Sequence, residues 1–199
     1  MSINAPALKI SLKCNTDSSI EDDSPMLLIA FASTEGQTRK IAERAASLAR
    51  AKGLEVELYD TSAIEDVPNV DAFDPIIVAA SVHEDRHQES ASNFVIAHRD
   101  QLGRKKTALI SVSLSAATAD GLREAQQYVD HFSATTGWHP ASTLLLAGAL
   151  QWADCDYFQR QVLEHILAAR GLTPKRDDAN EFTDWVALEK FIASFLSKG

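Results

Sequence analysis

The sequence lacks the features that mark membrane, secreted and nucleic-acid-binding proteins. No apolar run reaches the roughly 18 to 20 residues that span a bilayer, so we expect a soluble protein. Residues 1–25 do not have the basic and then apolar pattern of a secretory signal. A net charge of −9 at pH 7 argues against a nucleic-acid partner, because a phosphate backbone is bound by clustered lysines and arginines.

Cysteine is also scarce, with two residues in a chain of 199. Cys14 and Cys155 make neither a disulfide framework nor a pair at metal-ligand spacing, and we expect Cys155 to be a spare thiol. A chain without structural disulfides suits a reducing compartment. The sequence therefore predicts a cytoplasmic location.

The remaining composition predicts one domain preceded by a tail. Residues 1–25 mix serine, asparagine and aspartate and end in an acidic stretch, which is typical of a flexible tail, and an alternative start before Met26 stays open. The chain is 45% apolar overall, and no repeat or linker interrupts residues 26–199. We expect this segment to fold as a single compact domain.

Short apolar runs alternate with helical patterns along that domain. Residues 26–31 form a continuous apolar run, as in a strand buried on both faces, and apolar residues at helical spacing follow from 37 to 52. Further strands are expected at 55–59, 76–80, 107–112 and 143–149, and further helices at 90–101 and 122–132. This alternation predicts an α/β fold in which helices cover both faces of a parallel sheet.

Two more helices complete the predicted fold. One runs from Tyr157 to Arg170, and Thr183 or Asp184 caps the other. Each helix carries one apolar stripe, which we expect to pack against the core. The residues of the two stripes are Phe158, Val162, Leu163, Ile166 and Leu167, and Trp185, Leu188, Phe191, Ile192 and Phe195.

The loop after the first strand has the chemistry of a phosphate site. It contains hydroxyls at Ser33, Thr34 and Thr38, a flexible backbone at Gly36, and the start of a helix near Gln37. Hydroxyl donors, free amide groups and the helix dipole bind a phosphate monoester without lysine or arginine. The glycine patterns of nucleoside triphosphatases and of dinucleotide-binding folds are absent from the sequence. The alternative interpretation is an ordinary helix cap rich in serine and threonine.

Several segments resemble the flavodoxin family, and in particular its menaquinone-dependent protoporphyrinogen oxidases. The resemblance begins with Phe31-Ala32-Ser33-Thr34-Glu35-Gly36-Gln37-Thr38, which is similar to the FMN phosphate loop. It continues in the same order over essentially the whole of residues 26–199. The later segments are Ile77-Val78-Ala79-Ala80-Ser81 with His87, Ser111-Val112-Ser113-Leu114, Leu146-Ala147-Gly148-Ala149-Leu150 and Phe182-Thr183-Asp184-Trp185.

This resemblance implies a flavodoxin-like open five-stranded parallel sheet that binds FMN. It implies an activity as well, the stepwise dehydrogenation of protoporphyrinogen in haem biosynthesis, with flavin taking the electrons and a quinone reoxidising it. His87 is a candidate for proton transfer, Trp152 for the substrate mouth, and no metal is expected. The implied cofactor residues are Ser33, Thr34, Glu35, Gly36, Gln37, Thr38, Ser81, Val82, Ser113, Leu114, Ser115, Gly148 and Ala149.

The chain departs from the family pattern in two loops. Val82-His83-Glu84-Asp85-Arg86 stands where the family has an Ile-Arg-Tyr-Gly stretch, and Gln151-Trp152-Ala153-Asp154-Cys155-Asp156 replaces an Arg-Tyr pattern with further basic and aromatic residues. Basic side chains that could face propionates or anionic lipid are lost, so at most peripheral contact with the inner face of the membrane is expected. The changes concern the substrate and the electron acceptor, not the phosphate loop.

The sequence leaves several functions open. His83-Glu84-Asp85-Arg86-His87 matches the zinc-protease pattern His-Glu-x-x-His, but the segment follows directly after a strand, whereas the zinc motif needs a continuous helix. Besides the porphyrinogen oxidase, the chain could be a flavodoxin-type electron carrier whose acidity helps it to dock on a basic protein. A module that has lost its flavin is the third class, and a homo-oligomer stays open.

Overall fold

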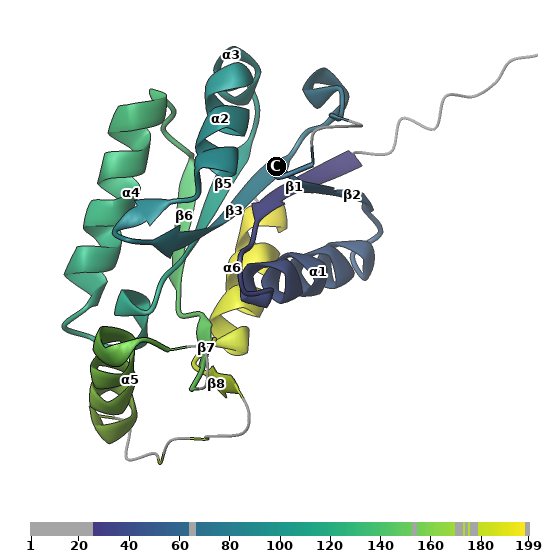
Figure 1. Ribbon diagram of the computed structural model, residues 1–199. Coiled ribbons are helices and arrows are strands. Elements are labelled where there is room, and N and C mark those ends of the chain that lie inside the picture. Colours follow the sequence, from purple (N-terminus) through teal and green to yellow (C-terminus); the bar gives the residue numbers. More distant parts are fainter. Residues whose placement is uncertain are drawn as a thin grey trace, which may run out of the picture.

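The computed structural model describes residues 26–63, 67–152, 155–169 and 179–197, together with Thr173 and Lys175. The expected tail, residues 1–25, lies outside the described residues. In the described part, strands and helices alternate as the sequence predicts (Figure 1).

The core of the fold is a parallel sheet of five strands in the order β2-β1-β3-β5-β6. The strands are β1 (Met26–Ala32), β2 (Glu55–Asp60), β3 (Ile76–His83), β5 (Thr107–Val112) and β6 (Ser142–Leu146). Every neighbouring pair in this order is parallel, and β1 pairs with β2 on one side and β3 on the other. The α/β class, the strand number and the parallel arrangement are confirmed. The connections from β1 therefore diverge at its carboxyl end, which is the place where open sheets of this kind bind ligands.

Helices cover both faces of the sheet (Figure 1). The helices α1 (Gln37–Arg50) and α6 (Trp185–Ser197) lie on one face, and α2 (Glu89–Ala97), α3 (Arg99–Leu102) and α4 (Leu122–Thr136) lie on the other. Alternate residues of β1 point to the two layers: Ile29 packs in the α1/α6 core and Leu28 in the α2/α4 core. This two-sided burial explains why the strand is a continuous apolar run.

The end of β3 differs from the sequence-based expectation of a plain loop. The strand continues to His83 and turns back through Glu84 and Asp85, which have positive φ angles of 48° and 63°. The short strand β4 (Arg86–His87) then pairs antiparallel with β3. Two left-handed residues at the centre of a two-residue turn match the twist of a tight hairpin. Within this hairpin His87 is paired with Val82, and its side chain is buried, not exposed to solvent.

The segment after β6 builds a small separate layer. The predicted strand 143–149 breaks at Ala147 and Gly148, and β7 (Ala149–Gln151) pairs instead with β8 (Ala179–Glu181). The intervening helix α5 (Tyr157–Ala169) packs with this ribbon around its own apolar cluster. The buried members of the cluster are Ala117, Ala147, Leu150, Cys155, Leu163, Ile166, Leu167 and Phe182.

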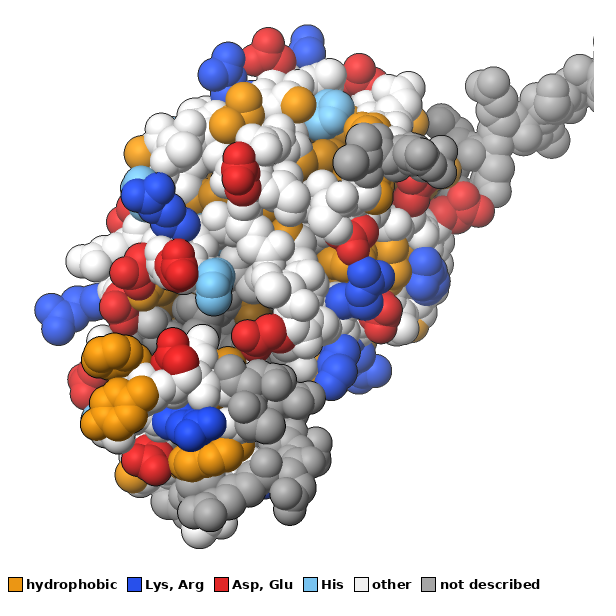
Figure 2. All heavy atoms as spheres, viewed as in Figure 1, with side chains coloured by type: hydrophobic (Ala, Val, Ile, Leu, Met, Phe, Trp, Pro, Cys, Tyr) orange, Lys and Arg blue, Asp and Glu red, His pale blue; other side chains and the backbone are white. Residues whose placement is uncertain are grey.

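The predicted packing stripe of α5 is wrong at two of its five positions. Leu163, Ile166 and Leu167 are buried as expected, but Phe158 is 76% exposed and Val162 is 47% exposed. Tyr157 lies edge to face with Phe158, so the start of α5 presents an apolar surface, and Figure 2 shows hydrophobic side chains gathered over this helix. The three buried positions are those that belong to the cluster of the small layer. The stripe of α6 is buried at Leu188, Ile192 and Phe195 and half-buried at Trp185 and Phe191.

Candidate functional site

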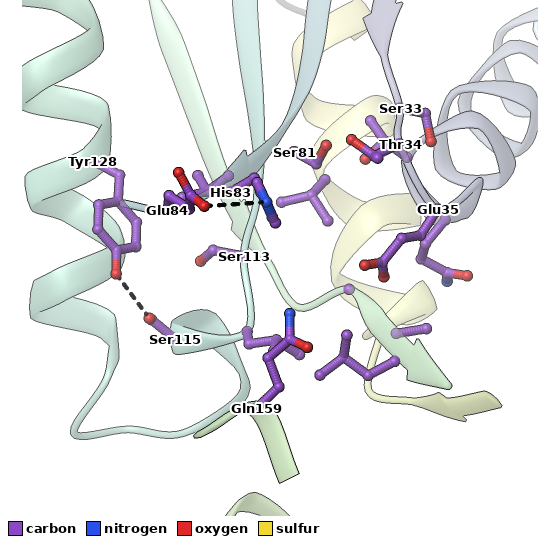
Figure 3. A pocket seen from close by; sticks show the side chains of 18 of the residues that line it. Ser33, Thr34, Glu35, Ser81, His83, Glu84, Ser113, Ser115, Tyr128 and Gln159 are labelled. Carbon is purple, nitrogen blue, oxygen red and sulfur yellow. Dashed lines mark hydrogen bonds and ion pairs between the residues drawn. The ribbon is translucent and has the colours of Figure 1, made fainter. Parts of the chain in front are cut away.

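The main pocket of the described structure lies at the carboxyl ends of β1, β3 and β5. Figure 3 shows the phosphate-type loop with Ser33, Thr34 and Glu35 at one end and Tyr128 at the other. The pocket thus extends away from the β1/β3 junction, and residues from β7 and α5 close its lower side. The lining residues are Ser33, Thr34, Glu35, Gln37, Thr38, Ser81, Val82, His83, Glu84, Asp85, Val112, Ser113, Leu114, Ser115, Tyr128, Gly148, Ala149, Leu150 and Gln159.

The loop between β1 and α1 presents donors that lack partners within the described structure. Gly36 turns the chain with φ of 86°, in the left-handed region that favours glycine, and no side chain caps α1. The first amide groups of a helix have no acceptor within the helix, so they are left to face an anion. The Ser33 hydroxyl is buried, and no partner for it lies among the described residues. A phosphate group supplies the acceptors that these donors need.

Gln88 fixes the loop against the end of β3. Its Nε2 donates to the Thr34 hydroxyl at 2.5 Å and to the Ser81 hydroxyl at 2.6 Å. Thr34 Oγ1 accepts one hydrogen bond in this arrangement and keeps its own hydrogen to donate to a ligand. No pattern in the sequence indicates a role for Gln88, because only the folded chain brings the start of α2 next to the β1 loop.

Apolar and small residues line the middle of the pocket. Val82 is the penultimate residue of β3, Leu114 follows β5, and Val112 packs beside Gly148. A Cβ atom at Gly148 would lie 3.3 Å from Val112 Cγ1, so glycine keeps this wall open. Such walls have the chemistry that an aromatic ligand needs, since ligand pockets combine apolar faces with a few placed polar groups. All the expected cofactor residues line the pocket except Gly36, which shapes the loop backbone.

Tyr128 joins the two walls at the end opposite the phosphate-type loop. Its hydroxyl donates to Asp85 Oδ1 at 3.1 Å and lies 3.3 Å from Ser115 Oγ, and Ser115 donates to Glu124 Oε2 at 2.7 Å. Burial, as the largest cause, raises the pKa of Tyr128 to about 12. The phenol therefore stays protonated at neutral pH and can donate to the Asp85 carboxylate.

His87 lies apart from the residues that line the pocket. Its ring is 7% exposed, lies 4.7 Å from the Phe132 ring and places Nε2 2.9 Å from the Ser111 hydroxyl. Burial, with a smaller contribution from His131, lowers the pKa of His87 to about 4. The imidazole is therefore neutral at physiological pH, and it packs between Phe132 of α4 and Ser111 of β5.

Trp152, the residue predicted for the substrate mouth, is not among the residues that line the pocket, and some lining residues were not predicted. Trp152 is half-buried, and the Arg160 guanidinium lies 6.0 Å from the centre of its ring. His83, Tyr128 and Gln159 line the pocket and were not predicted. Tyr128 and Gln159 lie on predicted helices, but no pattern in the sequence indicates that these helices reach the pocket.

The His-Glu-x-x-His pattern falls on the β3–β4 hairpin and not on a helix. The His83 side chain is 61% exposed, and its Nε2 lies 3.9 Å from Glu84 Oε1, whereas His87 is buried. Within the described residues no group of three or more histidine, cysteine or acidic side chains could hold a metal ion. The motif therefore lacks the geometry on which its zinc chemistry depends.

The fold and the pocket define a class of protein. The sheet order β2-β1-β3-β5-β6 is 2-1-3-4-5 when the five strands are numbered along the chain, which is the order of flavodoxin-type folds. The uncapped start of α1 and the buried Ser33 hydroxyl without a partner in the described structure lie where this fold binds FMN. The chain belongs to the flavodoxin domain family, whose model matches residues 28–177. Because the donors of the β1 loop fit a phosphate monoester and FMN is the ligand of this fold at this position, the expected FMN cofactor is confirmed.

Curated relatives match most of the chain, and a solved structure shares its fold. The chain is 26% identical over 165 residues to "Protoporphyrinogen IX dehydrogenase [quinone]" of Escherichia coli K12, covering 82% of this chain and 91% of that protein. It is 24% identical over 176 residues to the protein of the same name from Leishmania major, covering 87% and 76%. Oxidised flavodoxin 1 of Bacillus cereus superimposes with a TM-score of 0.53 at 19% identity, covering 87% of this chain and 99% of the other.

No helix in the described part of the chain is both long and apolar enough to cross a membrane.

Proposed function

We propose that this protein is an FMN-dependent oxidoreductase that dehydrogenates a porphyrinogen and passes the electrons to a quinone. Two relatives that carry the name of that activity align with most of the chain, at 24–26% identity. The observation that carries the proposal is the lower wall of the pocket. Leu150 and Gln159, from the layer of β7, β8 and α5, extend the pocket beyond the loops that hold a flavin.

The residues of the chain divide the work along the pocket. Ser33, Thr34 and the start of α1 would hold the phosphate, and Val82 with Leu114 would line the part of the pocket that takes the ring. Bound FMN supplies a two-electron acceptor that a quinone can reoxidise. The layer under the pocket would exclude water from that side of the site, and it would give a substrate an apolar surface at Leu150.

The acidic rim of the pocket supports a second candidate function. Glu84 and Asp85 are exposed at its open side, and the chain carries a net charge of −9. A negative surface around a redox site attracts a basic protein partner, as expected for an electron carrier. We place this function second because a carrier needs no wall built from an extra layer.

The experiment that separates the two functions measures protoporphyrin fluorescence. FMN-loaded protein is mixed with protoporphyrinogen and either menaquinone or ubiquinone analogues, and FMN-free protein serves as the control. We expect fluorescence to rise faster with the loaded protein and to depend on the quinone. If the loaded protein leaves the rate at the control value with every quinone, yet its flavin can still be reduced chemically, the carrier function is favoured.

A further inference from the structure

One pocket residue is held from outside the pocket. Gln37, the first residue of α1, is 7% exposed, and its Nε2 donates to Thr183 Oγ1 at 2.9 Å. The two residues are 146 positions apart in sequence. Thr183 is not among the residues that line the pocket. It belongs to the segment before α6, which packs beside α1 in Figure 1.

Thr183 is itself fixed on both sides. Its hydroxyl donates to the Ala147 carbonyl at 2.9 Å, so it accepts from Gln37 with a lone pair and has a definite orientation. The amide of the preceding Phe182 donates to the Gly148 carbonyl at 3.0 Å. On the other side, Asp184 Oδ1 accepts from the Ala187 amide at 2.9 Å and caps α6.

The β1 loop needs such a support. Gly36 has no side chain to fix its conformation, and α1 has no side-chain cap of its own. The Gln37 side chain therefore attaches the start of α1 to a rigid part of the fold, on the side away from the Gln88 contact to Thr34. Donors bind a phosphate tightly only when they are held in place before it arrives.

We propose that Thr183 is a positioning residue for the FMN phosphate: it orients Gln37 and so aligns the amide groups at the start of α1. This proposal rests on FMN as the cofactor. It gives a reason for the Phe182-Thr183-Asp184-Trp185 segment to accompany the Ser33–Thr38 loop, because the first segment supports the second. It also predicts an effect confined to the phosphate end of the ligand.

The test compares the Kd of FMN with the Kd of riboflavin, which lacks the phosphate. Removing one hydrogen bond changes a free energy by about 1 kcal/mol, or roughly fivefold in Kd. We expect T183V to weaken FMN about fivefold and riboflavin less than twofold, and T183S to restore the wild-type ratio. T136V is the matched control, since the Thr136 hydroxyl also donates to a backbone carbonyl, that of Phe132, but lies away from the pocket.

A double-mutant cycle with Q37L covers the case in which T183V folds poorly. If Thr183 acts through Gln37, T183A, which also removes the hydroxyl, weakens FMN relative to riboflavin in the wild-type background but leaves the FMN-to-riboflavin ratio of Q37L unchanged, and T183V does the same wherever that variant folds. Equal weakening of FMN and riboflavin by T183V would overturn the proposal, as would an unchanged FMN Kd or the same ratio change in T136V. Failure of the wild-type protein to bind FMN would overturn the proposal and the cofactor assignment together.

Discussion

Removal of the Ser33 hydroxyl should raise the stability of the FMN-free protein and lower its affinity for FMN. The Ser33 Oγ atom is buried and has no hydrogen-bond partner in the described structure. A buried hydroxyl without a partner costs roughly 1–3 kcal/mol, which Ser33→Ala removes. At about 2–4 °C for each kcal/mol in a domain of this size, we expect the FMN-free variant to melt roughly 2 to 12 °C higher.

The effect on FMN binding has the opposite sign. A hydrogen bond from a hydroxyl to a charged group contributes about 1.5–3 kcal/mol, so Ser33→Ala should weaken FMN roughly 10- to 150-fold. Riboflavin, without the phosphate, should bind the variant and the wild type equally. Calorimetric melting of the FMN-free proteins and titrations by flavin fluorescence quenching measure the two effects.

Ser90→Ala is the contrasting control. The Ser90 hydroxyl accepts from Thr61 at 3.0 Å and lies outside the pocket lining, so its loss should lower the melting temperature and leave the FMN Kd unchanged. The account of the β1 loop is refuted if Ser33→Ala lowers the stability of the FMN-free protein, or if FMN binds Ser33→Ala as tightly as the wild type.

Three further predictions concern stability and charge. The pKa of His87 is lowered from 6.5 to about 4, so between these pH values the unfolded chain binds a proton that the folded chain does not. The free energy of unfolding should therefore fall by on the order of 3 kcal/mol as the pH drops through this window. Urea melts at a series of pH values measure this, and the free energy of unfolding should depend less on pH in His87→Gln than in the wild type. Gly121→Ala places a Cβ 2.1 Å from the Ser115 carbonyl oxygen and should cost about 2 kcal/mol by thermal melting, whereas Gly103→Ala, with its nearest contact at 3.4 Å, should change stability little. Glu84 and Asp85 are exposed on the rim of the pocket and should repel the carboxylates of a diacid substrate, so the KM for protoporphyrinogen dimethyl ester should not exceed that for the diacid. Glu84→Lys should lower the KM for the diacid roughly two- to fivefold. A lower KM for the diacid than for the ester in the wild type would contradict this prediction.

The sheet and the phosphate end of the site follow from local patterns, which is why the sequence predicts them well. Residues 26–31 are apolar throughout because both faces of β1 are buried, and the Ser33–Thr38 loop follows β1 directly. Strand, loop and helix start are thus neighbours in the chain, and their spacing alone places donors at the switch point.

The ring end of the site depends on contacts between distant elements. The β3–β4 hairpin has positive φ angles at Glu84 and Asp85. A Glu-Asp pair does not indicate a left-handed turn in the sequence as Asn-Gly would. It turns His87 into the interior and leaves His83 at the pocket. Tyr128 and Gln159 arrive on α4 and α5, and an amphipathic pattern cannot specify which polar residue of a helix meets a ligand.

The most direct test of the proposed function is a single turnover without oxygen. FMN-loaded protein is mixed with protoporphyrinogen in the absence of a quinone, and the visible flavin absorbance is followed together with porphyrin fluorescence. We predict that the flavin absorbance bleaches as porphyrin appears and returns when a quinone is added. Flavin that keeps its absorbance with protoporphyrinogen, yet bleaches with dithionite, would contradict the proposed activity.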